Sequence, residues 1–250
     1  FRLPSWVVAG LLSALLYLLG ARLVSRRGAL FAVAAFWLTP RSLFHGYLSC
    51  FDMPMAWAWL LVVYAYWRAL SKRSWAIWTG VAYGIALSVK HNAWIIPGVL
   101  LIHFLLAEAP KAWRAGRQRG LLRALEPFFG MVTIGPAVFY LHWPYLWHHP
   151  IDRFLWYANF HGQHINYPWE FLGQLLVEAP FPVGYAFVVT ALTVPFALVA
   201  LMATGAAREI GRFVATWIYR PFQRYLEPLD TDSLLLLGNG FASLVVFSVP

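Results

Sequence analysis

The segment 40–54 holds a first group of residues whose types suit chemistry. It carries Arg41, His45 and Asp52 in a short polar stretch that directly precedes a long apolar run. A carboxylate at the edge of such a run, with two basic side chains nearby, is a candidate for substrate binding or catalysis. The structural alternative is a helix cap, because Asp52 stands two residues before a proline that suits the first turn of a helix.

The run Lys90-His91-Asn92 is a second group, and it separates two apolar stretches. A lysine ammonium can hold a phosphate as a point charge, and Lys90 is therefore a candidate catalytic residue. The imidazole of His91 and the amide of Asn92 suit the positioning of phosphate or hydroxyl oxygens. The structural alternative is snorkelling, in which the lysine stem covers apolar surface while its ammonium reaches water.

A third group lies in the segment of about 144–183, which is rich in Trp, Tyr, His and Pro. It includes His161, His164 and Tyr167, which we interpret as substrate-binding candidates. Long ordered loops are usually functional, and aromatic rings stack on the CH-rich faces of sugars. The same composition also suits a helix that lies on the membrane surface.

The elements that must position these residues are predicted to be membrane helices. The chain is 61% hydrophobic and only 12% charged, with a mean hydropathy of +0.62, which is unlike a soluble domain. Its net charge of +9 arises beside apolar runs, and this favours contact with membrane lipids over nucleic acid. The single Cys50 excludes an internal disulfide and gives no thiolate metal framework.

Runs of apolar residues predict an all-α, polytopic bundle of about eight transmembrane spans. They lie at about 5–24, 28–40, 53–70, 75–89, 93–107, 128–143, 184–204 and 233–249. No shift in composition marks a second domain, so we interpret residues 1–250 as a single membrane domain. Because the chain begins without Met and close to an apolar run, we interpret it as an N-terminally incomplete domain.

The basic residues are segregated along this succession of spans. All but four of the nineteen Lys and Arg residues follow the first, third, fifth or seventh span. The positive-inside rule therefore places the N-terminal edge outside, together with Asp52, Lys90 and the segment 144–183. Two basic segments, 108–127 and 208–226, are also amphipathic. They suit short interfacial helices, or simply anchors that fix the topology.

No metal-ligating set can be assigned from the spacing of histidines. His148-His149 and His161-x-x-His164 lack a third ligand at a recognisable distance. Haem is also disfavoured, because His103 is the only histidine clearly inside a predicted span.

Several spaced motifs resemble a known family of membrane enzymes. They are the run from Pro40 to Pro54, the run from Gly80 through Lys90-His-Asn to Pro97, the run Asn159-Phe-His-Gly-Gln-His-Ile-Asn-Tyr-Pro-Trp169, and the stretch 182–195. Together they are similar to bacterial glycosyltransferases of the GT-C fold class, which are related to protein O-mannosyltransferases and the lipid A aminoarabinose transferase. The likeness covers roughly residues 30–200.

This resemblance implies transfer of a sugar from a polyprenyl-phosphate donor to a protein, lipid or glycan acceptor. The reaction would take place on the extracytoplasmic side of a bacterial inner membrane, through a single inverting displacement. A carboxylate must take the proton of the acceptor hydroxyl. The departing phosphate needs Lys, Arg, His or a divalent cation such as Mg²⁺ or Mn²⁺.

The resemblance also assigns roles to residues. Asp52 matches the family's second acidic site, near the donor phosphate, and Lys90 matches a basic position. His161, His164 and Tyr167 match a motif that we expect to position the acceptor or the donor. The family's principal catalytic carboxylate belongs to an outer loop that would precede Phe1.

Two alternatives come from other functional classes. A polytopic transporter or lipid flippase predicts ionisable residues deep within the spans and often inverted repeats. Here the charges lie at the boundaries of the apolar runs and no repeat is evident. The other alternative is a non-catalytic assembly factor.

Overall fold

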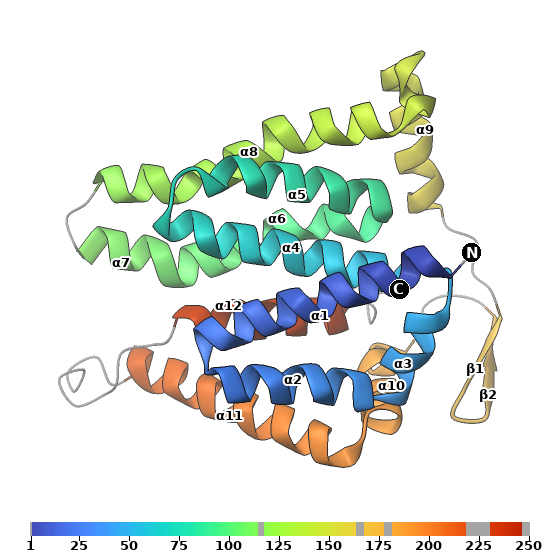
Figure 1. Cartoon of the computed structure of the whole chain (residues 1–250), viewed down its shortest axis with the longest axis vertical. Helices are drawn as coiled ribbons and strands as arrows, with labels where there is room; N and C mark the ends of the chain where they lie inside the picture. Colours follow the sequence, from blue (N-terminus) through green and yellow to red (C-terminus); the bar gives the residue numbers. More distant parts are fainter. Residues whose placement is uncertain (1, 115–117, 164–167, 178–181, 219–230, 247–250) are drawn as a thin grey trace.

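The computed structural model describes residues 2–114, 118–163, 168–177, 182–218 and 231–246. Long helices run side by side, and several of the shorter elements lie at one end of the bundle (Figure 1). The longer helices are α1 (Leu3–Leu23), α2 (Arg26–Leu38), α4 (Asp52–Ser71), α5 (Trp75–Val89), α8 (Gln118–His142), α11 (Phe196–Ile218) and α12 (Thr231–Val246). The shorter elements are α3 (Pro40–Tyr47), η1 (His91–Ile95), α6 (Ile96–His103), η2 (Phe104–Glu108), α7 (Ala109–Arg114), η3 (Pro144–Trp147), α9 (Pro150–Gly162), α10 (Tyr185–Thr193) and the strands β1 (Trp169–Phe171) and β2 (Gln174–Leu176).

The described part of each of the eight predicted spans coincides with helical structure, which confirms the helical membrane fold, while residues 247–249 of the last span lie outside the described residues. The seventh is divided at Val194 and Pro195 into α10 and α11, because proline cannot continue a helix as an interior residue. Three described helical stretches are long and apolar enough to cross a membrane: Leu3–Leu23, His91–Trp113 and Gly120–His142. A fourth is added if α3 and α4, bent by 107°, form one broken span. The count of eight spans stays a prediction.

The two basic amphipathic segments do not form separate interfacial helices in the described residues. Residues 109–114 continue the stretch α6–η2, and residues 118–127 are the first turns of α8. Residues 208–218 are likewise the C-terminal half of α11. This continuity favours the alternative of anchors that fix the topology for the described parts of both segments. Their apolar residues extend the helices that cross the bundle, while their arginines lie at its end.

The long segment after α8 also contains a feature that the apolar pattern did not predict. β1 and β2 pair as an antiparallel hairpin, with Trp169 opposite Leu176. Its two turn residues, Leu172 and Gly173, have φ of 51° and 79°. Positive φ at both positions matches the right-handed twist of a hairpin. All other regular elements of the described residues are helices.

Helices α5 and α8 are in close contact on one side of the bundle. Gly80 lies against the backbone of Gly130, and Gly84 lies against Gly135 and Val138. A Cβ atom at Gly84 would approach the Gly135 carbonyl oxygen to 2.6 Å. Small residues at a membrane helix interface allow this approach of backbones. The other side of α5 packs on α4, whose Val62, Val63 and Tyr66 are fully buried.

Polar side chains inside the bundle are paired across helices. Trp59 and Trp67 donate from Nε1 to Asn239 Oδ1 at 2.9 Å and to Asp232 Oδ1 at 3.0 Å, which ties α4 to α12. His103 contacts the Tyr66 hydroxyl at 3.1 Å through Nδ1 and the Thr231 carbonyl at 2.9 Å through Nε2. Both of its ring nitrogens are therefore engaged in holding helices together, as buried polar groups require.

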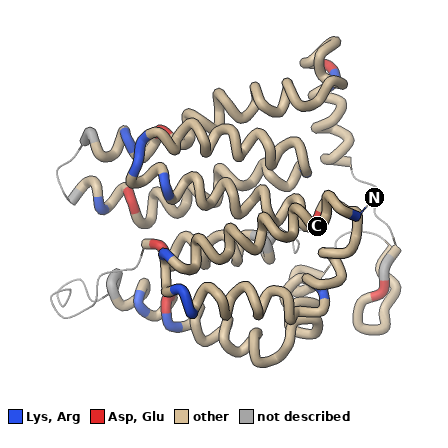
Figure 2. The backbone as a smooth tube through the Cα atoms, in the orientation of Figure 1, with Lys and Arg blue, Asp and Glu red and all other residues tan. Residues whose placement is uncertain are grey.

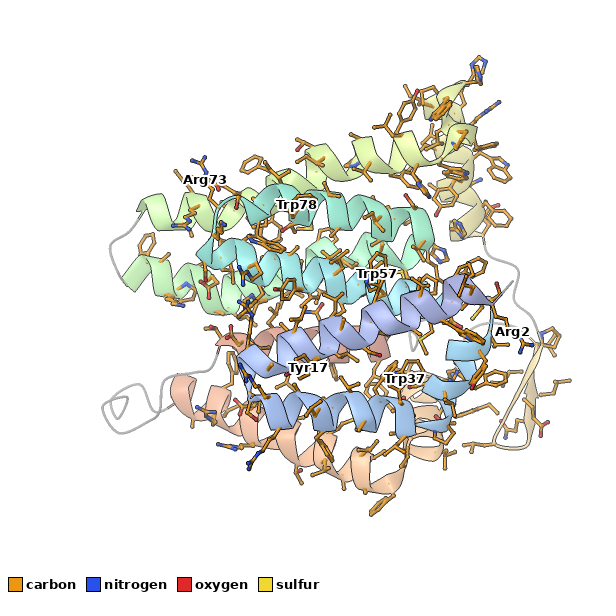
Figure 3. The ribbon with its side chains drawn as sticks, viewed as in Figure 1. Arg2, Tyr17, Trp37, Trp57, Arg73 and Trp78 are labelled. Carbon is orange, nitrogen blue, oxygen red and sulfur yellow. The ribbon has the colours of Figure 1, made fainter. Side chains whose placement is uncertain are left out.

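The segregation of charge along the sequence becomes a segregation in space. Figure 2 shows most Lys and Arg residues at the end of the bundle where α1 meets α2 and α4 meets α5. Arg73 lies at this basic end, and Arg2 lies at the opposite end (Figure 3). The opposite end carries α3, η1, η3 and α9 (Figure 1). We refer to it as the site end.

The α5–α8 contact makes a first prediction about stability. Gly84→Leu should destabilise the protein by about 1–3 kcal/mol, because the added side chain meets backbone that cannot yield. The thermal unfolding midpoint in detergent should fall by roughly 2–10 °C. Gly10→Leu is the matched control, because no atom lies within 4 Å of a Cβ built at Gly10. Equal midpoints for the two variants would contradict this account of the packing.

Candidate functional site

The turn between α3 and α4 brings the first group of predicted residues together. α3 ends at Tyr47, α4 begins at Asp52, and the two helices are bent by 107°. Gly46 is buried against Trp37, where a Cβ atom would lie 2.8 Å from the indole ring. Trp37 in turn donates from Nε1 to Ser13 Oγ at 2.8 Å. Glycine at position 46 therefore allows α3 to rest on α2 in a fixed place.

Asp52 contacts three side chains from separate segments. Its Oδ2 lies 3.0 Å from His45 Nδ1 and 3.6 Å from Cys50 Sγ. Its Oδ1 lies 3.7 Å from Lys90 Nζ. The residue at the N-cap of α4 is Phe51, and no side chain caps that end of the helix. The alternative of an N-cap role for Asp52 is therefore wrong. Its negative charge still interacts favourably with the positive end of the α4 dipole.

Lys90 contacts this carboxylate and also lines a cleft. It follows the last residue of α5 with extended backbone, at φ −160° and ψ 143°, which directs the chain from α5 into η1. The cleft has a volume of about 560 Å³. Its lining comes from the start of α4, the end of α5, η1, the end of α8 and α9: Phe51, Leu87, Ser88, Val89, Lys90, His91, Phe139, His142, Trp143, Tyr157 and His161.

The lining suits a ligand with an anionic and an apolar part. Its polar side includes one lysine and three histidines, and the residues that line it include no Asp or Glu. Its apolar side combines aliphatic and aromatic side chains. A phosphate would be favoured near Lys90 because the ammonium is a localised positive charge. A sugar or prenyl chain would fit the ring-lined part.

Helix α9 contributes to the cleft through aromatic contacts. The rings of His91 and His161 stack with centroids 4.0 Å apart, and Tyr157 meets Trp143 edge to face at 4.9 Å. Burial raises the pKa of the Tyr157 phenol above its usual 10.0. The phenol therefore stays protonated at neutral pH and can donate a hydrogen bond into the cleft.

The other predicted residues lie around this centre. Arg41 and His45 line a second hollow beside α3, together with Pro40, Phe44 and Thr193. Asn92 is half-buried on η1 next to His91, and it is absent from the described lining of the cleft. His164 and Tyr167 lie outside the described residues. The structure thus brings together Asp52, Lys90, His45, His91 and His161.

Sequence reasoning passed over several residues of the site. Cys50 was set aside because a lone cysteine has no partner spacing, yet it lies beside His45 and Asp52. Leu87 and Phe139 lie inside predicted spans, where nothing in a periodic pattern separates lining from core, and Phe51 lies just before one. His142 and Trp143 stand at the end of a predicted span next to the segment 144–183, and that position is the signal that could place them in the cleft.

The comparison with known proteins decides the family. Residues 1–143 match the family described as dolichyl-phosphate-mannose-protein mannosyltransferase. The chain belongs to this family. The match covers α1 to α8 and includes Asp52, Lys90 and His142, while α9 follows it. Membership indicates a mannosyltransferase-type glycosyltransferase in an integral membrane protein, and it suggests a polyprenyl-phosphate sugar donor. No curated protein and no solved structure matches the chain.

The cleft makes a prediction about ligand binding. Lys90→Met should weaken binding of a short-chain prenyl phosphate by about 10- to 100-fold, because a charge-assisted contact is worth about 1.5–3 kcal/mol. Lys72→Met is the matched control, since Lys72 is exposed and directly follows α4 at the basic end. Calorimetric titration of the detergent-solubilised protein measures both. Equal affinities in the two variants would show that Lys90 does not bind the phosphate.

Proposed function

We propose that this protein transfers a sugar from a polyprenyl-phosphate donor to an acceptor hydroxyl on the extracytoplasmic side of a bacterial inner membrane. The observation that carries the proposal is the contact between Asp52 and Lys90, which lines the cleft, with Oδ1 and Nζ 3.7 Å apart. Lys90 would hold the donor phosphate and stabilise the charge that develops on it. The aromatic lining would take the sugar and the first prenyl units.

The orientation of the site supports this sidedness. Most Lys and Arg residues lie at the basic end of the bundle, whereas the cleft opens at the site end. Cytoplasmic loops carry the excess of Lys and Arg in membrane proteins. The basic end is then cytoplasmic, and the cleft faces the compartment beyond the membrane. Exposed apolar residues beside it, such as Phe44 and Phe51, suit contact with a lipid tail.

The contact between Asp52 and Lys90 favours a role for Asp52 on the phosphate side of the reaction. In an inverting displacement the attacking hydroxyl and the leaving phosphate lie on opposite faces of the anomeric carbon. In inverting glycosidases, the two carboxyl groups that serve such opposite faces are about 6.5–9.5 Å apart. Asp52 and Lys90 are in contact, which is too close for opposite faces. Asp52 would act on the phosphate side, where its carboxylate orients Lys90 and His45.

The proposed reaction is a single displacement. The acceptor oxygen forms a bond to the anomeric carbon as the bond from that carbon to the phosphate oxygen breaks. The electron pair of the broken bond leaves with polyprenyl phosphate, next to Lys90. The acceptor proton passes to a base on the opposite face of the sugar. This arrangement agrees with the resemblance of Asp52 to an acidic site near the donor phosphate.

A double-mutant cycle tests the shared role of Asp52 and Lys90. Lys90→Ala should lower kcat for sugar transfer by about 10²–10³, the loss typical of removing one group that stabilises developing charge. Asp52→Asn should also lower it, and the double variant should lose no more than Lys90→Ala alone, because groups that act as a unit are not additive. The measurement uses the intact protein in membranes with a labelled polyprenyl-phosphate sugar.

The matched control is Asp152→Asn, which removes an exposed carboxylate from the first turn of α9 at the same end. Transfer by this variant should equal that of the unchanged protein. If the losses in kcat of the two single variants multiply in the double variant, Asp52 acts independently of Lys90, as a base. Unchanged transfer in both single variants would overturn the proposed site.

A further inference from the structure

The turn between α3 and α4 gathers three side chains of the types that bind transition metals. His45 comes from the last turn of α3, Cys50 from the turn itself and Asp52 from the first turn of α4. One ligand atom from each lies within 4.8 Å of the other two. Imidazole nitrogen, thiolate sulfur and carboxylate oxygen are the three kinds of ligand that zinc takes in proteins.

The distances fit a shared ion. Sγ of Cys50 lies 3.9 Å from Nδ1 of His45 and 3.6 Å from Oδ2 of Asp52, and Nδ1 lies 3.0 Å from Oδ2. Ligands bound to zinc at about 2.0–2.3 Å in tetrahedral geometry are roughly 3.3–3.6 Å apart from one another. The distance of 3.9 Å lies above this range, that of 3.0 Å lies below it, and that of 3.6 Å lies at its upper limit. Shifts of a few tenths of an ångström would place all three atoms around one ion.

The two oxygens of Asp52 face different partners. Oδ2 points to His45 and Cys50, while Oδ1 points to Lys90. A metal ion at Oδ2 would therefore leave the contact with Lys90 in place. A metal-bound carboxylate is normally held by a further polar partner of this kind, which fixes its orientation.

The surrounding packing holds the three ligands in place before an ion binds. Gly46 on α3 rests against the ring of Trp37, and Met53 and Met55 on α4 are buried. The ligand side chains remain accessible, since the side chains of His45 and Asp52 are 24% and 48% exposed. An ion could enter from solvent, and a fourth coordination position would stay open.

We propose that His45, Cys50 and Asp52 bind one transition-metal ion of the zinc class. The donor set selects the metal, because thiolate and imidazole favour Zn²⁺ whereas Mg²⁺ and Mn²⁺ prefer oxygen ligands. Three protein ligands with an open fourth position are the arrangement of a zinc site that also takes water or a substrate oxygen. The Cys50 thiol loses its proton to solvent as the ion binds. This site stands independently of the proposed sugar transfer.

Cobalt substitution tests the site directly. The protein, purified without a polyhistidine tag and treated with a chelator, is titrated with Co²⁺ in detergent. One equivalent should produce a thiolate-to-cobalt charge-transfer band and the intense visible bands of four-coordinate Co²⁺. Zn²⁺ should abolish these bands, and a large excess of Mg²⁺ should leave them unchanged.

Two variants assign the ligands. Cys50→Ser should remove the charge-transfer band, and Cys50→Ser and His45→Ala should each weaken Co²⁺ binding by at least about 10-fold, since even outer partners of a metal cost this much when lost. His148→Ala is the matched control, because His148 lies at the same end of the bundle and outside the cluster. It should bind Co²⁺ as the unchanged protein does. Size-exclusion profiles and circular dichroism verify that each variant is folded.

The outcomes separate this proposal from the sugar transfer. A folded protein that gives no cobalt bands, or bands that survive Cys50→Ser, would overturn the metal site while leaving the transferase proposal intact. Cobalt binding that requires Cys50 would uphold the metal site even in a protein that transfers no sugar. A weak visible spectrum typical of oxygen ligands, without charge transfer, would also overturn it.

Discussion

The close contact between α5 and α8 is the constraint on which the rest of the structure depends. Glycines on both helices allow their backbones to meet, and the pair then packs on α4. Because the helices are held along their length, the end of α5, the end of α8 and the start of α4 converge at one end. Lys90, His142 and Phe51 line the same cleft for this reason. The site is thus a consequence of how three helices are packed well below it.

The distribution of charge complements this packing. A bundle whose outer surface is apolar cannot carry unpaired ions along its length without a large desolvation cost. Charged side chains therefore lie at the two ends of the bundle, where water or lipid headgroups solvate them. The charges at the basic end suit anchoring in the membrane, and in the ion pair of Arg73 with Glu126 the arginine side chain is largely exposed. At the site end, a few basic side chains surround one carboxylate, and there they are available to bind a ligand.

Most of the fold and part of the site could be predicted from the sequence. A long apolar run forms a helix in a membrane whichever helices it packs against, so the described part of each of the eight predicted segments coincides with helical structure. Asp52 and Lys90 could be placed at one end because the positive-inside rule acts on each loop separately. Their contact could not be predicted, since it depends on the α5–α8 packing and the bend before α4. Cys50 was passed over for the same reason, because ligands supplied by a turn between two helices follow no fixed spacing. The β-hairpin was missed because its short strands lack a clear alternating pattern.

The contacts of Asp52 explain how one carboxylate can belong to both a phosphate site and a metal site. Its Oδ1 faces Lys90, which lines the cleft, and its Oδ2 faces His45 and Cys50. A free base for the acceptor hydroxyl would need an oxygen directed at the opposite face of the sugar, without a cation competing for it. Asp52 meets neither condition. A carboxylate that orients one cation and ligates another would instead concentrate positive charge where the leaving phosphate must be stabilised. Within the proposed function, these contacts favour a role for Asp52 in the departure of the phosphate, with another group activating the acceptor.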